Sequence, residues 1–155
     1  MSGKARRFLI FTLHDKRYAL NVEDLSEVMV TPTTFPIPKA PEIFLGVMNF
    51  HGSPTPVLDL TTFLHGNPPN GGGSVLILDH KIGSLAIRID TVERIVSDIR
   101  GLQVRQDSGP YRRQSILFNE ETIPILAMDL VMTELEERMR TGRGNGSGSR
   151  KAKAG

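Results

Sequence analysis

The feature of this sequence that most limits its fold is an internal duplication. Three stretches of the first half match the second half in the same order: 8–11 with 75–78, 19–28 with 86–95, and 54–60 with 124–130. In the longest match, ALNVEDLSEV against AIRIDTVERI, the apolar, polar and acidic positions largely coincide. Chance does not readily produce three ordered matches, so the sequence predicts two diverged copies of one unit.

Each copy contains five short stretches that are apolar or alternate between apolar and polar residues, as strands do. We expect strands at Phe8–Leu13, Arg17–Asn21, Ser26–Val30, Gly46–Phe50 and Pro54–Leu58, and again at Val75–Asp79, Gly83–Ile89, Glu93–Ser97, Ser115–Asn119 and Thr122–Ala127. Four of the loops between these strands are short: His14–Lys16, Phe50–Ser53, His80–Ile82 and Asn119–Glu121. Short loops favour antiparallel hairpins. Ten prolines and few aromatic residues argue against a helical bundle. The sequence therefore predicts an all-β fold of two small barrels or a sandwich.

Each copy ends in Asp-Leu followed by a helix-like segment, so Asp59 and Asp129 are predicted helix caps. After Asp129, apolar residues at helical spacing predict an amphipathic terminal helix over about 130–140. The proline-rich stretch 31–41 is expected to be an extended connector, and 66–73 joins the copies.

These boundaries predict a single domain over residues 1–141. Its first subdomain covers about 8–65 and its second about 74–135. We expect the remainder, 142–155, to be a disordered, basic, glycine-rich tail.

The charge of the chain argues against a specific nucleic-acid partner. The net charge is +2, but the tail holds four of the 19 basic residues and none of the 17 acidic ones. The rest of the chain, with 15 bases against 17 acids, has no basic excess to bind phosphates.

The absence of cysteine excludes disulfides and thiolate metal sites and makes the cytoplasm the default location. The apolar run from Phe8 to Leu13 is too short for a signal or membrane segment, so we expect neither export nor membrane insertion.

No residue pattern of a catalytic or metal site is evident. The histidines His14, His51, His65 and His80 are scattered, without ligand-like spacing, and are interpreted as surface or turn residues. Asp59 and Asp129 suit capping better than a catalytic carboxylate pair, and no nucleophile elbow or phosphate-binding loop is present. We expect no cofactor, no metal and no enzymatic activity; an enzyme of unrecognised type is the remote alternative.

Several motifs together resemble the CheW family of chemotaxis coupling proteins. They are Arg7–Leu13 (RFLIFTL), Tyr18–Leu20 (YAL), Asp24–Val28 (DLSEV), Pro36–Pro41 (PIPKAP), Leu45–Gly52 (LGVMNFHG) and Pro56–Leu60 (PVLDL). The likeness runs from about Arg7 to Leu135 and is more specific in the first half. It implies two five-stranded SH3-like β-barrels around a shared hydrophobic core.

The resemblance also implies a function. Members of this family are cytoplasmic adaptors that join the tips of chemoreceptors (methyl-accepting chemotaxis proteins) to the regulatory domain of a CheA-type histidine kinase in a chemosensory array. Other CheW-like proteins are further expected partners. The alternative is a divergent adaptor that binds receptor or kinase but not both, and serves pili-based motility or another output.

Carried over by position, the resemblance assigns receptor binding to Glu27, Val28 and His51, and kinase binding to Val30, Phe35, Gly46 and Val47. A competing interpretation puts the apolar members in the core and gives Gly46 only a backbone role. One departure stands out: the family commonly has Asn-Leu-Arg-Gly where this chain has Asn49-Phe50-His51-Gly52. Histidine is mostly neutral near pH 7 and lacks the guanidinium fork, which predicts altered receptor contact.

Overall fold

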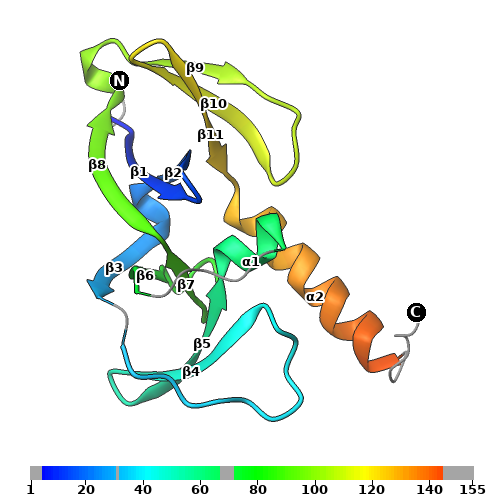
Figure 1. The fold of residues 1–155 in the computed structure, drawn as a ribbon. Helices are drawn as coiled ribbons and strands as arrows, with labels where there is room; N and C mark the ends of the chain where they lie inside the picture. Colours follow the sequence, from blue (N-terminus) through cyan, green and yellow to red (C-terminus); the bar gives the residue numbers. More distant parts are fainter. Residues whose placement is uncertain (1–4, 31, 67–71, 145–155) are drawn as a thin grey trace.

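The computed structural model describes residues 5–30, 32–66 and 72–144 (Figure 1). The described elements are β1 (Arg7–Leu13), β2 (Lys16–Asn21), η1 (Val22–Asp24), β3 (Leu25–Val30), β4 (Phe44–Phe50), β5 (Ser53–Asp59), α1 (Leu60–His65), β6 (Ser74–Leu78), β7 (Ala86–Ile89), β8 (Thr91–Ser97), η2 (Asp98–Arg100), β9 (Gln103–Gln106), β10 (Arg112–Phe118), β11 (Glu121–Leu126) and α2 (Met128–Gly144). All ten predicted strands are present, which confirms the mainly β fold. The additional strand β9 was missed because QVRQ is short and has one apolar residue.

The strands form two sheets, and each sheet takes strands from both sequence copies. Sheet 1 has the order β8-β1-β2-β11-β10-β9, and sheet 2 has the order β3-β6-β7-β5-β4. In the duplication, strands β1, β2, β3, β4 and β5 of the first copy correspond to β6, β7, β8, β10 and β11 of the second. When each strand of sheet 1 except β9 is replaced by its counterpart, the order becomes that of sheet 2. The first hairpin of each copy therefore completes the sheet of the other copy. The sheets do not follow the predicted ranges 8–65 and 74–135.

Three of the hairpins use two-residue turns. Both turn residues have positive φ, as type I′ requires, at His14–Asp15, His51–Gly52 and Asn119–Glu120. This turn matches the right-handed twist of the paired strands. The predicted antiparallel hairpins are confirmed, including the pairing of β6 with β7, whose connection is longer.

The core has three parts because β1 and β6 are buried on both faces. Alternate residues of β1 separate: Leu9, Phe11 and Leu13 enter a large cluster between the sheets, whereas Phe8 and Ile10 pack within sheet 1. Strand β6 does the same, with Leu76 and Leu78 in the large cluster and Val75 and Ile77 packed within sheet 2. Both copies thus contribute to one shared hydrophobic core, as the resemblance implied.

The two predicted helix caps differ in outcome. Asp59 caps α1, where its carboxylate accepts a hydrogen bond from the Thr62 N–H at 3.3 Å. The cap at Asp129 was wrong: this residue lies inside the first turn of α2, and its carboxylate pairs with Arg113 at 2.8 Å. The pairing with Arg113, with a smaller opposing effect of burial, lowers the pKa of Asp129.

Helix α2 is longer than the predicted segment 130–140. It is amphipathic, with Met128, Val131 and Leu135 buried. It includes 142–144, the first residues of the predicted tail. The remaining tail, 145–155, and the stretch 67–71 between the copies lie outside the described residues.

A compact polar loop connects β9 to β10. The Asp107 carboxylate accepts hydrogen bonds from the Ser115 hydroxyl, from the Gly109 N–H at 2.9 Å and from Arg112 Nε at 3.0 Å. These hydrogen bonds, that of Ser115 first, lower the pKa of Asp107 from 3.8 to about 2. The carboxylate therefore stabilises this loop in its ionised form.

We predict that Asp107→Asn destabilises the protein at pH 7 and that this difference from the wild type shrinks in acid. Since the folded state lowers the pKa, the stabilisation is complete above 3.8 and is lost as the pH falls toward about 2. Urea unfolding at several pH values measures the difference in the free energy of unfolding between the wild type and Asp107→Asn. Asp15→Asn, in the exposed β1–β2 turn, is the control. A difference between wild type and Asp107→Asn that does not change with pH would contradict the prediction.

Candidate interaction surface

Strand β3 is an edge strand of sheet 2 and carries exposed apolar side chains. Val28 is 47% exposed and Val30 is 80% exposed, and their spacing puts both on one face of the strand. Met29, between them, faces the other way and packs against the core of sheet 2. Phe35, in the connector that follows, is 62% exposed. A core position is thereby excluded for all three predicted site residues, Val28, Val30 and Phe35.

The connector lies directly against β4. Phe35 and Val47 form an antiparallel bridge, in which each N–H donates to the other's carbonyl at 2.9 and 2.8 Å. Gly46 permits this approach: it has φ +146°, and a Cβ atom there would lie 2.4 Å from the Phe35 carbonyl oxygen. The structure therefore brings Phe35, Gly46 and Val47 together, and it gives Gly46 a definite role in holding the connector.

Glu27 and His51 meet across the two edges of sheet 2. Glu27 lies on β3 and His51 in the β4–β5 turn, with His51 Nε2 3.8 Å from Glu27 Oε1. Both side chains are largely exposed, so the contact itself contributes little stability. The structure thus joins two of the three predicted receptor-binding residues. Val28 is next to Glu27 but points to the opposite face of β3.

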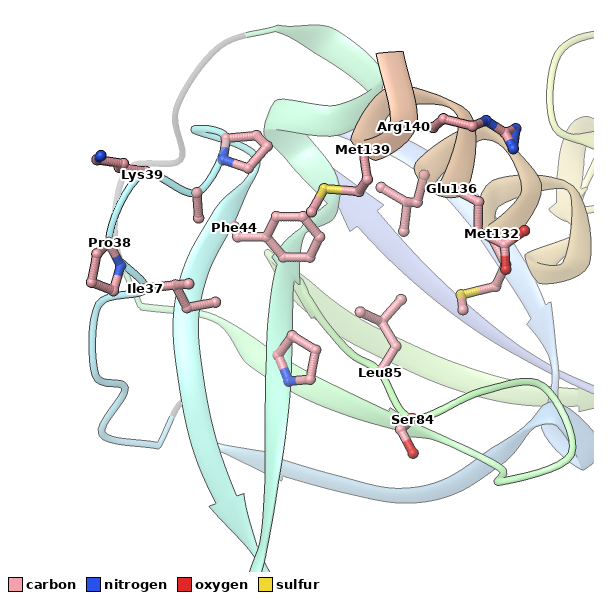
Figure 2. Close-up of a pocket in the computed structure, with 14 residues that line it drawn as sticks. Ile37, Pro38, Lys39, Phe44, Ser84, Leu85, Met132, Glu136, Met139 and Arg140 are labelled. Atoms are coloured by element: carbon pink, nitrogen blue, oxygen red, sulfur yellow. The ribbon is translucent and has the colours of Figure 1, made fainter. Parts of the chain in front are cut away.

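Between the connector and α2 lies an apolar groove whose place and lining residues were not predicted (Figure 2). Its volume is about 750 Å³. Its apolar walls include Ile37, Phe44, Pro56, Leu85, Met132 and Met139, and charged side chains Lys39, Glu136 and Arg140 also line it. The groove brings together segments about a hundred residues apart. The sequence indicated its helix wall through the apolar positions of the terminal helix, since Met132, Leu135 and Met139 all line the groove, and Met139 remains 41% exposed.

Two of the scattered histidines lie side by side. The rings of His14 and His65 are 5.8 Å apart, and His65 Nε2 is 3.1 Å from the Tyr18 hydroxyl. Burial first, and then the neighbouring charges of Lys16 and His14, lower the pKa of His65.

The described residues contain no group of three or more His, Cys, Asp or Glu placed to hold a metal ion. Nor does any described helix meet the length and hydropathy needed to cross a membrane.

Comparison with known proteins places this architecture in a family. The chain belongs to the CheW-like domain family, whose model matches residues 7–136. The sequence resemblance is thereby confirmed.

One solved structure shows the same fold. The chain is similar to the scaffolding protein TtCheW from Thermoanaerobacter tengcongensis, with a TM-score of 0.66 and 20% sequence identity over 79% of this chain and 89% of that one. At this identity the likeness concerns the fold. A search of curated protein sequences found no match.

We predict that Gly46→Ala displaces the connector. The added Cβ would clash with the Phe35 carbonyl, so we expect a loss of about 2–4 kcal/mol in the free energy of unfolding. Gly52→Ala is the matched control, since Gly52 has φ +82° but open space around it; about 1 kcal/mol is expected there. Urea unfolding gives both values, and the exchange rate of the Phe35 amide reports the connector. Equal losses for the two variants would contradict the assigned clash.

Proposed function

We propose that this chain is a non-enzymatic, cytoplasmic adaptor that couples chemoreceptors to a CheA-type histidine kinase in a chemosensory array. Membership of the CheW-like family supports the proposal. The observation that carries it is the exposure of three apolar side chains at the two edge strands of sheet 2: Val28 and Val30 on β3, and Phe35 in the connector that is held on β4. Exposed apolar groups gathered on one part of a folded surface are typical of protein contacts.

The receptor is proposed to bind at Glu27, Val28 and His51. A chemoreceptor tip is a helical hairpin, and a helix docks by placing its apolar side against an apolar surface with polar groups at the border. Val28, which faces the other side of β3 from Glu27, provides the apolar contact at this edge strand. Glu27 and His51 provide a polar pair at the end of the same sheet.

The kinase is proposed to bind at Val30, Phe35, Gly46 and Val47. The bridge between Phe35 and Val47 holds the connector on β4, and Phe35 is presented outward from it. An aromatic side chain held on a rigid backbone is a suitable anchor for a partner. The two proposed sites are then neighbours on sheet 2, and other CheW-like proteins are further candidate partners.

A second candidate function is a divergent adaptor that binds receptor or kinase but not both, and serves pili-based motility or another output. The observation in its favour is His51, which replaces the family's usual arginine and lies beside Glu27. Separate binding measurements with each partner distinguish the two functions.

We predict that adding the protein to a receptor tip and its cognate kinase raises kinase activity.

Glu27→Lys is expected to weaken receptor binding about tenfold and to leave kinase binding unchanged, and Phe35→Ser is expected to weaken kinase binding and to leave receptor binding unchanged. Ile99→Ser is the control, because Ile99 is 75% exposed but lies on η2. Binding of one partner alone would favour the divergent adaptor. Binding of both with no change in kinase activity would contradict coupling.

We predict that His51→Arg strengthens binding of a typical chemoreceptor tip. The permanent charge and fork of arginine are expected to raise affinity about two- to fivefold, the effect of one exposed ion pair. His80→Arg is a matched control: it adds the same charge in another exposed turn, beside Asp79. Titration of the tip with each variant measures the change. Unchanged binding by His51→Arg would place position 51 outside the receptor interface, and weaker binding would contradict the prediction.

A further inference from the structure

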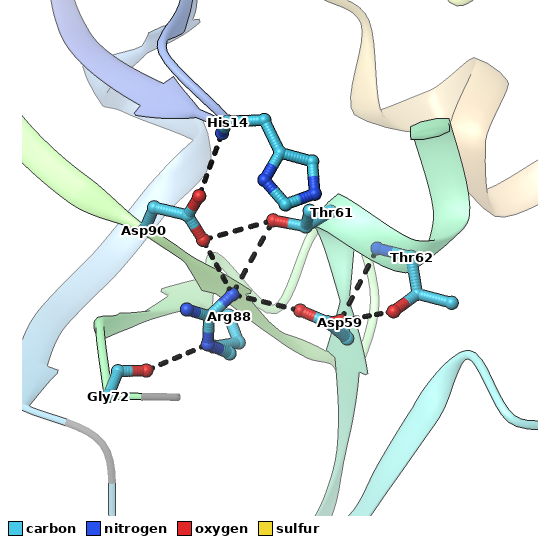
Figure 3. A network of polar contacts seen from close by, with 7 residues as sticks. All are labelled: His14, Asp59, Thr61, Thr62, Gly72, Arg88 and Asp90. Carbon is cyan, nitrogen blue, oxygen red and sulfur yellow. Dashed lines mark hydrogen bonds and ion pairs between the residues drawn. The ribbon is translucent and has the colours of Figure 1, made fainter. Parts of the chain in front are cut away.

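A buried arginine lies on the central strand of sheet 2, and Figure 3 shows its polar contacts. Arg88, on β7, has a side chain that is only 3% exposed. Its Nη1 donates a hydrogen bond to Asp59 Oδ1 at 3.0 Å and pairs with Asp90 Oδ1 at 2.8 Å. Its Nε donates to the Gly72 carbonyl at 2.8 Å. One guanidinium thus contacts three separate segments of the chain.

Each carboxylate that Arg88 contacts also holds a backbone N–H of another element. Asp59 accepts from the Thr62 N–H at the start of α1. Asp90 Oδ2 accepts from the His14 N–H at 2.8 Å, and its other oxygen accepts from the Thr61 hydroxyl at 3.1 Å. His14 is in the β1–β2 turn of sheet 1, whereas Asp59 ends β5 of sheet 2. The contacts therefore pass from one sheet to the other.

The third contact fixes the chain that enters β6. Two residues after Gly72, Ser74 pairs with Val30 at the end of β3. Gly73 fits closely here, because a Cβ atom would lie 2.2 Å from the Ile89 carbonyl oxygen and 2.9 Å from Arg88 Nη2. The last residue of β3, Val30, is thus connected to the Arg88 guanidinium through its pairing with Ser74 of β6 and through Gly72.

We propose that Arg88 is a positioning residue that locks α1, the β1–β2 turn and the start of β6 into one joint, and so sets how the two sheets are placed. A buried ion pair is often no more stabilising than apolar packing, so stability alone does not account for it. Directional hydrogen bonds from a planar fork do account for it, since they orient several partners at once. This role goes beyond the proposed function and does not depend on it.

Amide hydrogen exchange in the full chain tests the joint. In Arg88→Met, we expect the His14 and Thr62 amides both to exchange about tenfold faster relative to the β10–β11 amides, because the carboxylates that hold them lose their common partner. Arg113→Met is the control: it removes an exposed arginine–carboxylate pair in sheet 1 and should leave both amides unchanged.

If Arg88→Met does not fold, Arg88→Lys tests the same positioning role. Lysine keeps the charge but has no fork, so the same two amides should exchange faster by a smaller factor. Rates within twofold of the wild type, or acceleration of only one of the two amides, would overturn the proposal. Neither receptor nor kinase is needed, so a failure here is distinguishable from a failure of the coupling assay.

Discussion

The rest of the structure depends on the exchange of first hairpins between the two sequence copies. Neither copy can complete a sheet alone: the β1–β2 hairpin joins β11 through a parallel pair, and β7 joins β5 in the same way. The exchanged strands β1 and β6 become buried on both faces, which explains their nearly continuous apolar sequences. The shared core follows directly, because each of these strands packs within its own sheet and against the other sheet.

This arrangement suits an adaptor. An adaptor acts by the placement of its surfaces, and a scaffold whose sheets share strands and core keeps those surfaces in a constant relation. The proposed receptor and kinase sites lie on the edges of sheet 2, where Val30 pairs with Ser74 and Phe35 with Val47. Apolar burial supplies most of the cohesion between the sheets. The hydrogen bonds of Arg88 with Asp59 and Asp90 are directional and are proposed to orient the sheets where they meet.

Much of this fold could be predicted from the sequence, because strands and hairpins are local. Short stretches that are apolar or that alternate between apolar and polar residues marked the ten strands, and the duplication predicted two similar units. The exchange of hairpins could not be predicted, since an apolar strand pattern does not say which sheet it joins. Asp59 and Asp129 occupy equivalent positions in the copies, yet only Asp59 is a cap, because α2 begins at Met128 and so includes Asp129, whose carboxylate pairs with Arg113 instead.

The buried charge and the groove were missed for related reasons. Within AIRI, Arg88 has the sequence pattern of an outward polar residue; its partner Asp90 directly follows the same strand, but its buried partner Asp59 ends another strand, β5. The groove forms only when the connector and α2 meet. For the predicted site, local motifs identified Glu27 and His51 separately, but only the curvature of sheet 2 brings their side chains into contact.

Because the two sheets share strands and a core, we expect them to form one body that folds and unfolds together. Residue-by-residue NMR during urea unfolding measures this, with the amides of β10–β11 reporting sheet 1 and those of β6–β7 reporting sheet 2. We expect one transition with the same midpoint and the same denaturant dependence for both groups. Two separate transitions, with one sheet intact while the other is unfolded, would contradict it.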